Sequence, residues 1–249
     1  MLSQTLLLIV RAAGGALRGD ALADLRGTLQ GLRGHDAVKG GLDHQFWSRQ
    51  GDPKSAKESQ GKVGAWVEED GGGLRIFWPR QVLDQADREA RARAKDPEKE
   101  APTRRAMAGL SPTDVAEYLG AAEAMLRELE SAQVTEDKSE PYQGRPARCL
   151  TLKVEPRLSG RDRKYVKELH AKAKVWLGPD GVPLGAEREM SMKGRAFLVI
   201  SFEQKEKEEL RFTKVGDRLV TTYRHAVRSG SGGGESGQSS STTTLALRN

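Results

Sequence analysis

Four histidines and one cysteine are the residues of this chain best suited to bind a metal or attack a substrate. The histidines are at positions 35, 44, 170 and 225. None of them has metal-ligand spacing with another histidine or with the cysteine. Cys149 lies in the strand-like run Cys149–Leu152, with no positioned base signalled beside it. We therefore interpret Cys149 as a small buried hydrophobic residue, and its being single excludes an intramolecular disulfide.

The acidic and glycine-rich motifs do not indicate a catalytic site either. Glu68-Glu69 and Glu208-Glu209 are paired carboxylates, but such pairs are usually solvated in a chain with 35 acidic residues. Glycines 71–73 precede a strand and lack the Lys-Ser or Lys-Thr that a phosphate loop requires. No Gly-x-Ser-x-Gly elbow stands between a strand and a helix. We expect a protein that is not an enzyme and holds no cofactor or metal.

The net charge is +6, from 41 basic and 35 acidic residues that are interspersed along the chain. A nucleic-acid-binding protein more often has a basic stripe with aromatic residues between the charges, so we expect no nucleic-acid partner. Weak attraction to anionic membrane surfaces remains compatible with this charge. No apolar run approaches the roughly 18 residues of a transmembrane span.

The first 39 residues are expected to form an N-terminal helical segment. An apolar run, Leu6–Val10, is followed by the small residues Gly14-Gly15-Ala16, but no Lys or Arg precedes it. Residues 1–16 therefore indicate either a degenerate export signal or the first turns of a longer helix. Leucines at positions 22, 25, 29 and 32 predict an amphipathic helix over residues 20–33.

Residues 40–228 predict a curved antiparallel β domain with a helical insert at residues 80–131. Apolar residues alternate along the expected strands, and Asp180-Gly181 is a strong turn signal. Within the insert, Ser111 is a good N-cap for one helix that continues to Leu129. Residues 196–202 are apolar on both faces and predict a central strand in which Phe197 and Val199 oppose Leu198 and Ile200. Residues 229–241 predict a flexible Gly/Ser loop, and residues 242–247 a possible last strand.

The fold class is thus α+β and mainly antiparallel β, a strongly curved sheet or half-open barrel with a helical lid. Its hairpin at residues 174–184 resembles that of the periplasmic lipoprotein-carrier and lipoprotein-sorting superfamily (LolA/LolB-like), where an Asp/Gly turn and a Gly-x-Pro follow an aromatic-aliphatic pair. Residues 142–152 and 61–75 resemble its strand entry and early meander. The resemblance covers residues 40–78 and 142–228. It implies acyl chains held in an apolar concavity, and a location in the periplasm or cell envelope.

The leading prediction is a cell-envelope binding protein that holds lipid, an acyl chain or a lipoprotein in an apolar cavity under the lid. The alternative is a protein–protein interaction or sensor module on the same scaffold, without lipid cargo, and a cytoplasmic location remains an alternative too. A continuous apolar cavity would favour cargo, and a filled core would favour docking. The candidate lining residues share the apolar parity of their elements: Leu74, Ile76, Trp78, Leu119, Leu126, Leu150, Leu152, Val175, Leu184 and Met190.

Overall fold

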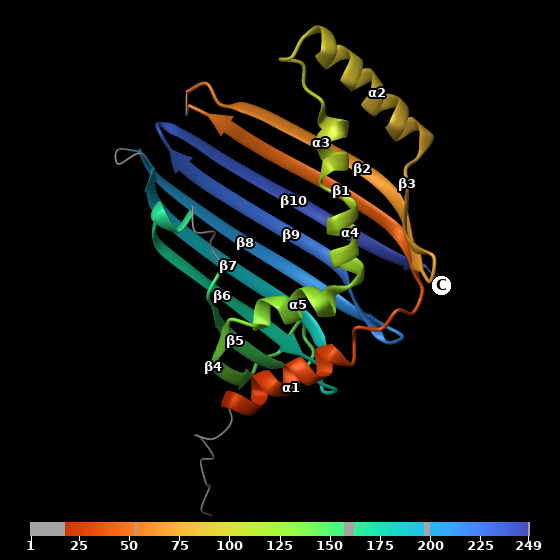
Figure 1. Cartoon of the computed structure of the whole chain (residues 1–249), viewed down its shortest axis with the longest axis vertical. Coiled ribbons are helices and arrows are strands. Elements are labelled where there is room, and N and C mark those ends of the chain that lie inside the picture. Colours follow the sequence, from red (N-terminus) through yellow and green to blue (C-terminus); the bar gives the residue numbers. More distant parts are fainter. Residues whose placement is uncertain (1–17, 53, 157–161, 197–199, 249) are drawn as a thin grey trace, which may run out of the picture.

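A computed structural model describes residues 18–52, 54–156, 162–196 and 200–248. The described residues form one ten-stranded antiparallel sheet and five α-helices (Figure 1). The helices are α1 (Arg18–Gln30), α2 (Arg80–Lys95), α3 (Pro102–Ala108), α4 (Pro112–Leu119) and α5 (Ala121–Leu129), and η1 (Asp162–Lys164) is a 3-10 helix. The strands are β1 (Val38–Gly51), β2 (Lys57–Asp70), β3 (Gly73–Phe77), β4 (Ala132–Ser139), β5 (Arg148–Val154), β6 (Val166–Leu177), β7 (Pro183–Ala196), β8 (Ile200–Val215), β9 (Arg218–Gly232) and β10 (Glu235–Arg248).

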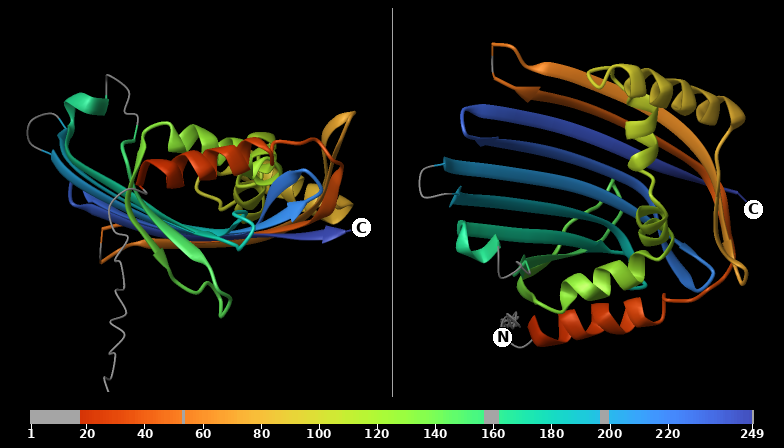
Figure 2. Two further views of the ribbon diagram at one scale, coloured as in Figure 1. Left: turned by 90° about the horizontal axis from the view of Figure 1, so that it is seen from below. Right: turned by 45° about the horizontal axis from the view of Figure 1, so that its top comes forward.

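The strand order is β3-β2-β1-β10-β9-β8-β7-β6-β5-β4. Two meanders, β1 to β3 and β4 to β10, are therefore joined by the pairing of β1 with β10. The sheet curves around the helices without closing into a barrel (Figure 2). The predicted fold class, mainly antiparallel with a strongly curved sheet, is confirmed.

The helical insert lies on the concave face and connects opposite edges of the sheet (Figure 2). It leaves β3 at one edge and enters β4 at the other. Nine strand spacings of about 4.8 Å separate these edges by roughly 43 Å along the sheet. Helices α3, α4 and α5 cover this distance across the concave face, and α1 lies beside α5 (Figure 1).

The predicted helix from Ser111 to Leu129 is wrong in one respect, since it breaks at Gly120 into α4 and α5. Its start is as expected: the Ser111 side chain accepts a hydrogen bond from the Asp114 N–H at 3.2 Å, and Pro112 follows the cap. Gly120 adopts a non-helical conformation, which glycine tolerates well. The Leu119 carbonyl accepts a hydrogen bond from Arg218 instead, at 3.0 Å. This break lets α4 and α5 pack on different parts of the sheet.

Two hydrophobic clusters fill the space between helices and sheet. One lies under α1 and α5 and contacts the strands from β4 to β9. The other lies under α3 and α4 and contacts β1, β2, β9 and β10. A third, small cluster lies on the convex face and contains Ala147, Cys149 and Trp176. The helical stripes of the sequence are therefore packing surfaces.

The predicted Gly/Ser loop at residues 229–241 is also wrong. These residues belong to β9 and β10, which turn at Gly233-Gly234, both with positive φ. β10 pairs with β1 on one side and with β9 on the other. Backbone hydrogen bonds to both neighbours therefore stabilise β10 as a strand, although its Gly and Ser residues have little intrinsic preference for strand. The expected last strand falls within β10.

The predicted single strand over residues 196–202 is wrong, because Ala196 ends β7 and pairs antiparallel with Ile200, which begins β8. The expected opposition of Phe197 and Val199 to Leu198 and Ile200 concerns side chains that lie outside the described residues.

Candidate functional site

The described helices leave part of the concave face uncovered, over the ends of β6 to β10 farthest from α1 and α5 (Figure 1). A hollow of about 640 Å³ lies there, which we call the open groove. Its floor consists mainly of Gly230, Gly232, Gly237 and Ser239, from the middle strands β9 and β10. Longer side chains flank this floor on both sides: Gln50 from β1, Met190 from β7, and Phe202, Gln204 and Glu206 from β8.

The strand register places the groove on the same face as the helices. Gly237 is opposite Gln50 and Gly230, and Gly230 is opposite Gln204. Gly230 shares its parity on β9 with Arg228 and Arg224, and Arg224 contacts Tyr118 of α4. A glycine floor allows another chain to approach the sheet backbone closely. The groove therefore has the shape of a binding trough with mixed walls, in which Gln50, Gln204 and Glu206 are polar and Met190 and Phe202 are apolar.

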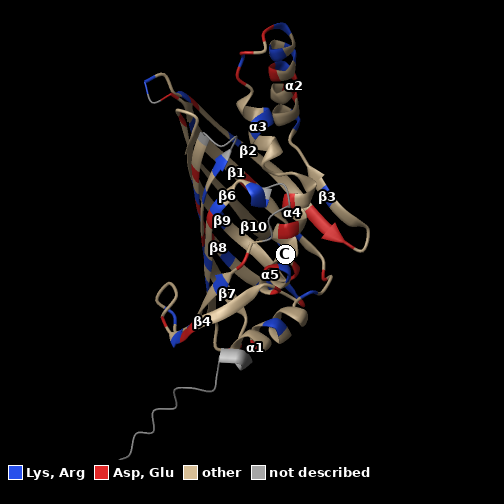
Figure 3. Ribbon diagram, turned by 60° about the vertical axis from the view of Figure 1, so that its left-hand side comes forward, with Lys and Arg blue, Asp and Glu red and all other residues tan. Residues whose placement is uncertain are grey.

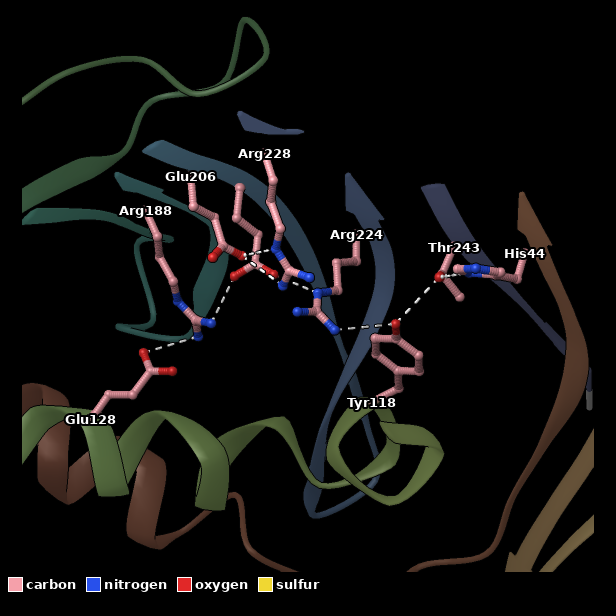
Figure 4. Close-up of polar contacts among 9 residues, drawn as sticks. His44, Tyr118, Glu128, Arg188, Glu206, Arg224, Arg228 and Thr243 are labelled. Carbon is pink, nitrogen blue, oxygen red and sulfur yellow. Dashed lines mark hydrogen bonds and ion pairs between the residues drawn. The ribbon is translucent and has the colours of Figure 1, made fainter. Parts of the chain in front are cut away.

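A chain of polar contacts crosses the concave face between the open groove and the helices (Figure 4). Its centre is Glu208, which is 4% exposed and binds Arg224 and, at 2.8 Å, Arg188. Arg188 also binds Glu128 of α5 at 3.0 Å. In the other direction, the chain runs from Arg224 through Tyr118 and Thr243 to His44. Arg224 Nη1 lies 3.5 Å from the Tyr118 hydroxyl, which donates to Thr243 Oγ1 at 3.2 Å.

The surroundings of three residues of the network shift their pKa values. Burial lowers the pKa of His44, whose Nδ1 lies 2.8 Å from Thr243 Oγ1, while Asp114 opposes this shift and Arg224 adds to it. Burial raises the pKa of Glu128 above its usual range, against the attraction of Arg188. Burial alone would lower the pKa of Arg224, but Glu208 and Tyr118 outweigh it and raise that pKa. These shifts favour the charged form of Arg224 and the neutral forms of His44 and Glu128.

The predicted lining residues do not surround one cavity. Leu150, Leu152 and Val175 are buried in the cluster under α1 and α5, and Leu126 packs against it. Leu119 is buried in the other cluster, under α3 and α4. At these five positions the space between sheet and helices is occupied by protein side chains.

Three other predicted residues do meet at a hollow. Leu74, Ile76 and Trp78, at the β3 edge, line a space of about 610 Å³ that we call the β3–α3 hollow. Its remaining lining comes from α2, α3 and the start of α4: Ala86, Arg104, Met107, Ala108, Leu110, Ser111 and Pro112.

The last two predicted residues lie elsewhere. Met190 flanks the open groove. Leu184 packs on the convex face against the cluster that contains Cys149 and Trp176, so its assignment to the inner face is wrong. The reason is a register shift between β6 and β7 at Trp176 and Leu177, which breaks the simple alternation on which the prediction rested.

The residues suited to reactive chemistry do not form a catalytic or metal site among the described residues. Cys149 is fully buried, and burial raises the pKa of its thiol to about 11, which disfavours the nucleophilic thiolate. Within the described ranges, no group of three or more His, Cys, Asp or Glu side chains is arranged to hold a metal ion. Basic and acidic residues are interspersed over the strands and helices (Figure 3). In the part of the chain that the structure describes, no helix combines the length and apolar character of a membrane span.

Sequence reasoning missed the groove floor and the buried network. The floor was hidden because Gly and Ser predict a loop. The network had a signal: Glu206 and Glu208 share the parity of the apolar Leu210 on β8, and Arg224 and Arg228 share a parity on β9. Charges on the apolar parity of neighbouring strands indicate buried ion pairs, but the register that joins them comes only from the structure.

No protein-family model matches the chain, and no curated protein matches it. Among solved structures, it is similar to one described as "Crystal structure of MucB in complex with MucA(peri)", with 9% sequence identity and a TM-score of 0.19. The alignment covers 92% of this chain and 94% of that chain. At this TM-score the likeness carries no argument about family or function. Membership of the lipoprotein-carrier superfamily therefore stays a prediction.

Proposed function

We propose that this chain is a non-enzymatic binding module that takes a polypeptide segment of a partner protein into the open groove. The observation that supports this best is the glycine floor between longer polar and apolar side chains, on the part of the concave face that the described helices leave uncovered. The lining offers hydroxyl, amide, carboxylate and guanidinium groups along its length, so it suits a ligand that also carries polar groups along its length. The filled space under α5, where cargo was expected, favours docking over enclosure.

Blocking the floor of the open groove tests the proposal. Gly237→Tyr would place a ring in the groove, and the Cβ position at Gly237 has only ordinary contacts, the nearest being Gln50 Cγ at 3.5 Å. Thr244→Tyr is the matched control, because Thr244 is exposed on the opposite face of the same strand. Both variants should keep the wild-type circular dichroism spectrum and melting temperature.

The assay is selection of random linear peptides displayed on phage against the full chain, followed by affinity measurement on the selected peptides. We expect peptides that bind wild type and Thr244→Tyr equally and bind Gly237→Tyr at least about 10-fold more weakly, a change of about 1.4 kcal/mol. If selection enriches no peptide, or if the selected peptides bind Gly237→Tyr as tightly as wild type, the groove is not a polypeptide site.

A second candidate function is binding of an acyl chain in the β3–α3 hollow, which the apolar side chains of Leu74, Ile76, Trp78, Met107 and Leu110 favour. Each buried methylene contributes about 0.8 kcal/mol, so eight to ten methylenes contribute about 6–8 kcal/mol before association costs. Ile76→Glu tests this candidate function, because it places a charge in the hollow.

The control for Ile76→Glu is Phe77→Glu, since Phe77 is 47% exposed on the opposite face of β3. Titration with a fluorescent fatty acid should show tight binding to wild type and Phe77→Glu and loss of binding to Ile76→Glu. Equal binding to all three proteins, or to none, would exclude an acyl site in this hollow.

The proposed setting is the periplasm or cell envelope, which the apolar run Leu6–Val10 and the hairpin at residues 174–184 support. Fusion of residues 1–40 to an alkaline phosphatase that lacks its own signal tests this, because that enzyme needs an oxidising compartment for its disulfides. Phosphatase activity in intact bacteria is the expected result, and an inactive cytoplasmic fusion favours the cytoplasmic alternative.

A further inference from the structure

A second, smaller hollow adjoins the open groove where the helices begin to cover the sheet. It measures about 280 Å³ and lies between α3, α4 and the strands β1, β9 and β10. Three arginines line it, and we call it the arginine hollow: Arg105 comes from α3, and Arg224 and Arg228 come from β9. It shares Arg228 and Ser239 with the open groove, so a chain lying in the groove reaches it.

The three arginines are held in place by different contacts. Glu208 binds Arg224, and Glu206 binds Arg228 at 2.8 Å, both from β8, which does not line the arginine hollow. Arg105 stacks its guanidinium over the Phe46 ring, 4.6 Å from the centroid. Among the described residues it has no ion-pair partner. Stacking on an aromatic face orients a guanidinium while leaving its N–H donors at the edge.

Guanidinium groups outnumber carboxylates in the lining of the arginine hollow. Asp114 is its one lining carboxylate, and Asp114 accepts a hydrogen bond from the Ser111 hydroxyl of its own helix cap. Tyr118, Ser239 and Ser241 add hydroxyl groups. A small ligand group with one or two oxygen atoms would therefore meet three guanidinium groups and several hydroxyls in the arginine hollow.

We infer that the arginine hollow binds a carboxylate of the segment that lies in the open groove, with Arg105 as the principal contact. This inference rests on the proposed function and specifies its ligand. A planar carboxylate matches the paired donors of a guanidinium edge. Its source is either an Asp or Glu side chain or the terminal carboxylate of the segment, and the same guanidinium chemistry recognises both.

NMR titration of the full chain with small carboxylates tests the inference directly. The probes are N-acetylglutamic acid α-amide, which has only a side-chain carboxylate, and N-acetylglutamine, which has only a terminal one. N-acetylglutamine amide has no carboxylate and serves as the control. We expect saturable shifts of the Nε–Hε signals of Arg105 and Arg228 with at least one carboxylate, at millimolar concentration, weakened by salt. The control should cause none, and whichever carboxylate binds more tightly identifies the source.

Arg105→Gln should weaken carboxylate binding at least about 10-fold, whereas Arg104→Gln should leave it unchanged, because Arg104 is the neighbouring exposed arginine and lines the β3–α3 hollow instead. Equal shifts with the amide control, or binding that is insensitive to Arg105→Gln, would overturn the inference. Selected phage peptides that fill the groove without an acidic group would do so too while leaving the proposed function intact. Carboxylate binding without any peptide binding would instead remove the proposed function and leave the anion site.

Discussion

Glu208→Gln is the substitution that most directly tests the buried network. It removes one negative charge from a side chain that is 5% exposed and that pairs with both Arg188 and Arg224. The amide keeps the shape and one acceptor oxygen of the carboxylate. Any large effect therefore reports the lost charge rather than a cavity.

The expected cost follows from the burial of the partners. Removing one member of a buried ion pair costs about 3–5 kcal/mol, mainly because the other charge stays buried without a partner. Here the side chains of Arg224 and Arg188 are 28% and 29% exposed, so water reaches both, and Arg188 keeps Glu128. We therefore expect a loss of about 2–3 kcal/mol in the free energy of unfolding, or a melting temperature lower by roughly 4–12 °C.

Glu206→Gln is the matched control, two residues away on the same face of β8. Glu206 pairs with Arg228, and their side chains are 25% and 59% exposed, so the loss should be about 0–1 kcal/mol. Urea denaturation followed by circular dichroism and tryptophan fluorescence gives both values, and equal slopes with denaturant show that the comparison is sound.

The reasoning is refuted if Glu208→Gln costs no more than Glu206→Gln. A double-mutant cycle of Glu208→Gln with Arg224→Gln adds a second check: the double variant should lose clearly less than the sum of the two single losses. Additive losses would mean that the two side chains do not stabilise each other.

Three further outcomes are expected. Gly109→Ala would drive its Cβ into the ring of His44, so it should lower the free energy of unfolding by about 1–3 kcal/mol in thermal melts. Gly27→Ala is the control, because its Cβ meets open space on α1. It should be neutral or raise the free energy of unfolding by up to about 1 kcal/mol. Because burial lowers the pKa of His44, the unfolded chain binds a proton at this residue more tightly, and the free energy of unfolding should fall as the pH drops below about 6.5. Urea denaturation at pH 7.5 and 5.5 should show that His44→Gln loses less stability between these two pH values than wild type does. Equal losses in the two proteins would contradict this. The thiol of Cys149 should react with Ellman's reagent only after unfolding, because it is fully buried and its pKa is raised to about 11. Fast labelling of the native chain would contradict this burial.

Local signals in the sequence predicted much of the sheet. The turn at Asp180-Gly181 and the helix cap at Ser111 lie where the sequence predicted them. Each depends on residues close together in the chain, whose preferences act before any tertiary contact forms. Helix continuity was less predictable, because a distant side chain, Arg218, takes the Leu119 carbonyl at the break.

Prediction failed where the neighbour across the sheet decides the outcome. The inner or outer position of Leu184 depends on a register shift in its pairing with β6. The strand state of residues 229–241 depends on β1, which lies about 190 positions earlier in the chain. The candidate site depends on the same pairings, since Arg224, Glu208 and His44 come from three strands. The register that joins these strands comes only from the structure.

The pairing of β1 with β10 also has a consequence for biosynthesis. His44 and Thr243, which contact each other across these strands, are 199 positions apart. A ribosome that adds about 5–20 residues per second makes β1 roughly 10–40 s before β10. During this interval one edge of β1 has unpaired backbone groups and can join the wrong strand, in the same chain or in another. Translation rate and the presence of a holding chaperone should therefore change the yield of native protein, while leaving its equilibrium stability unaltered.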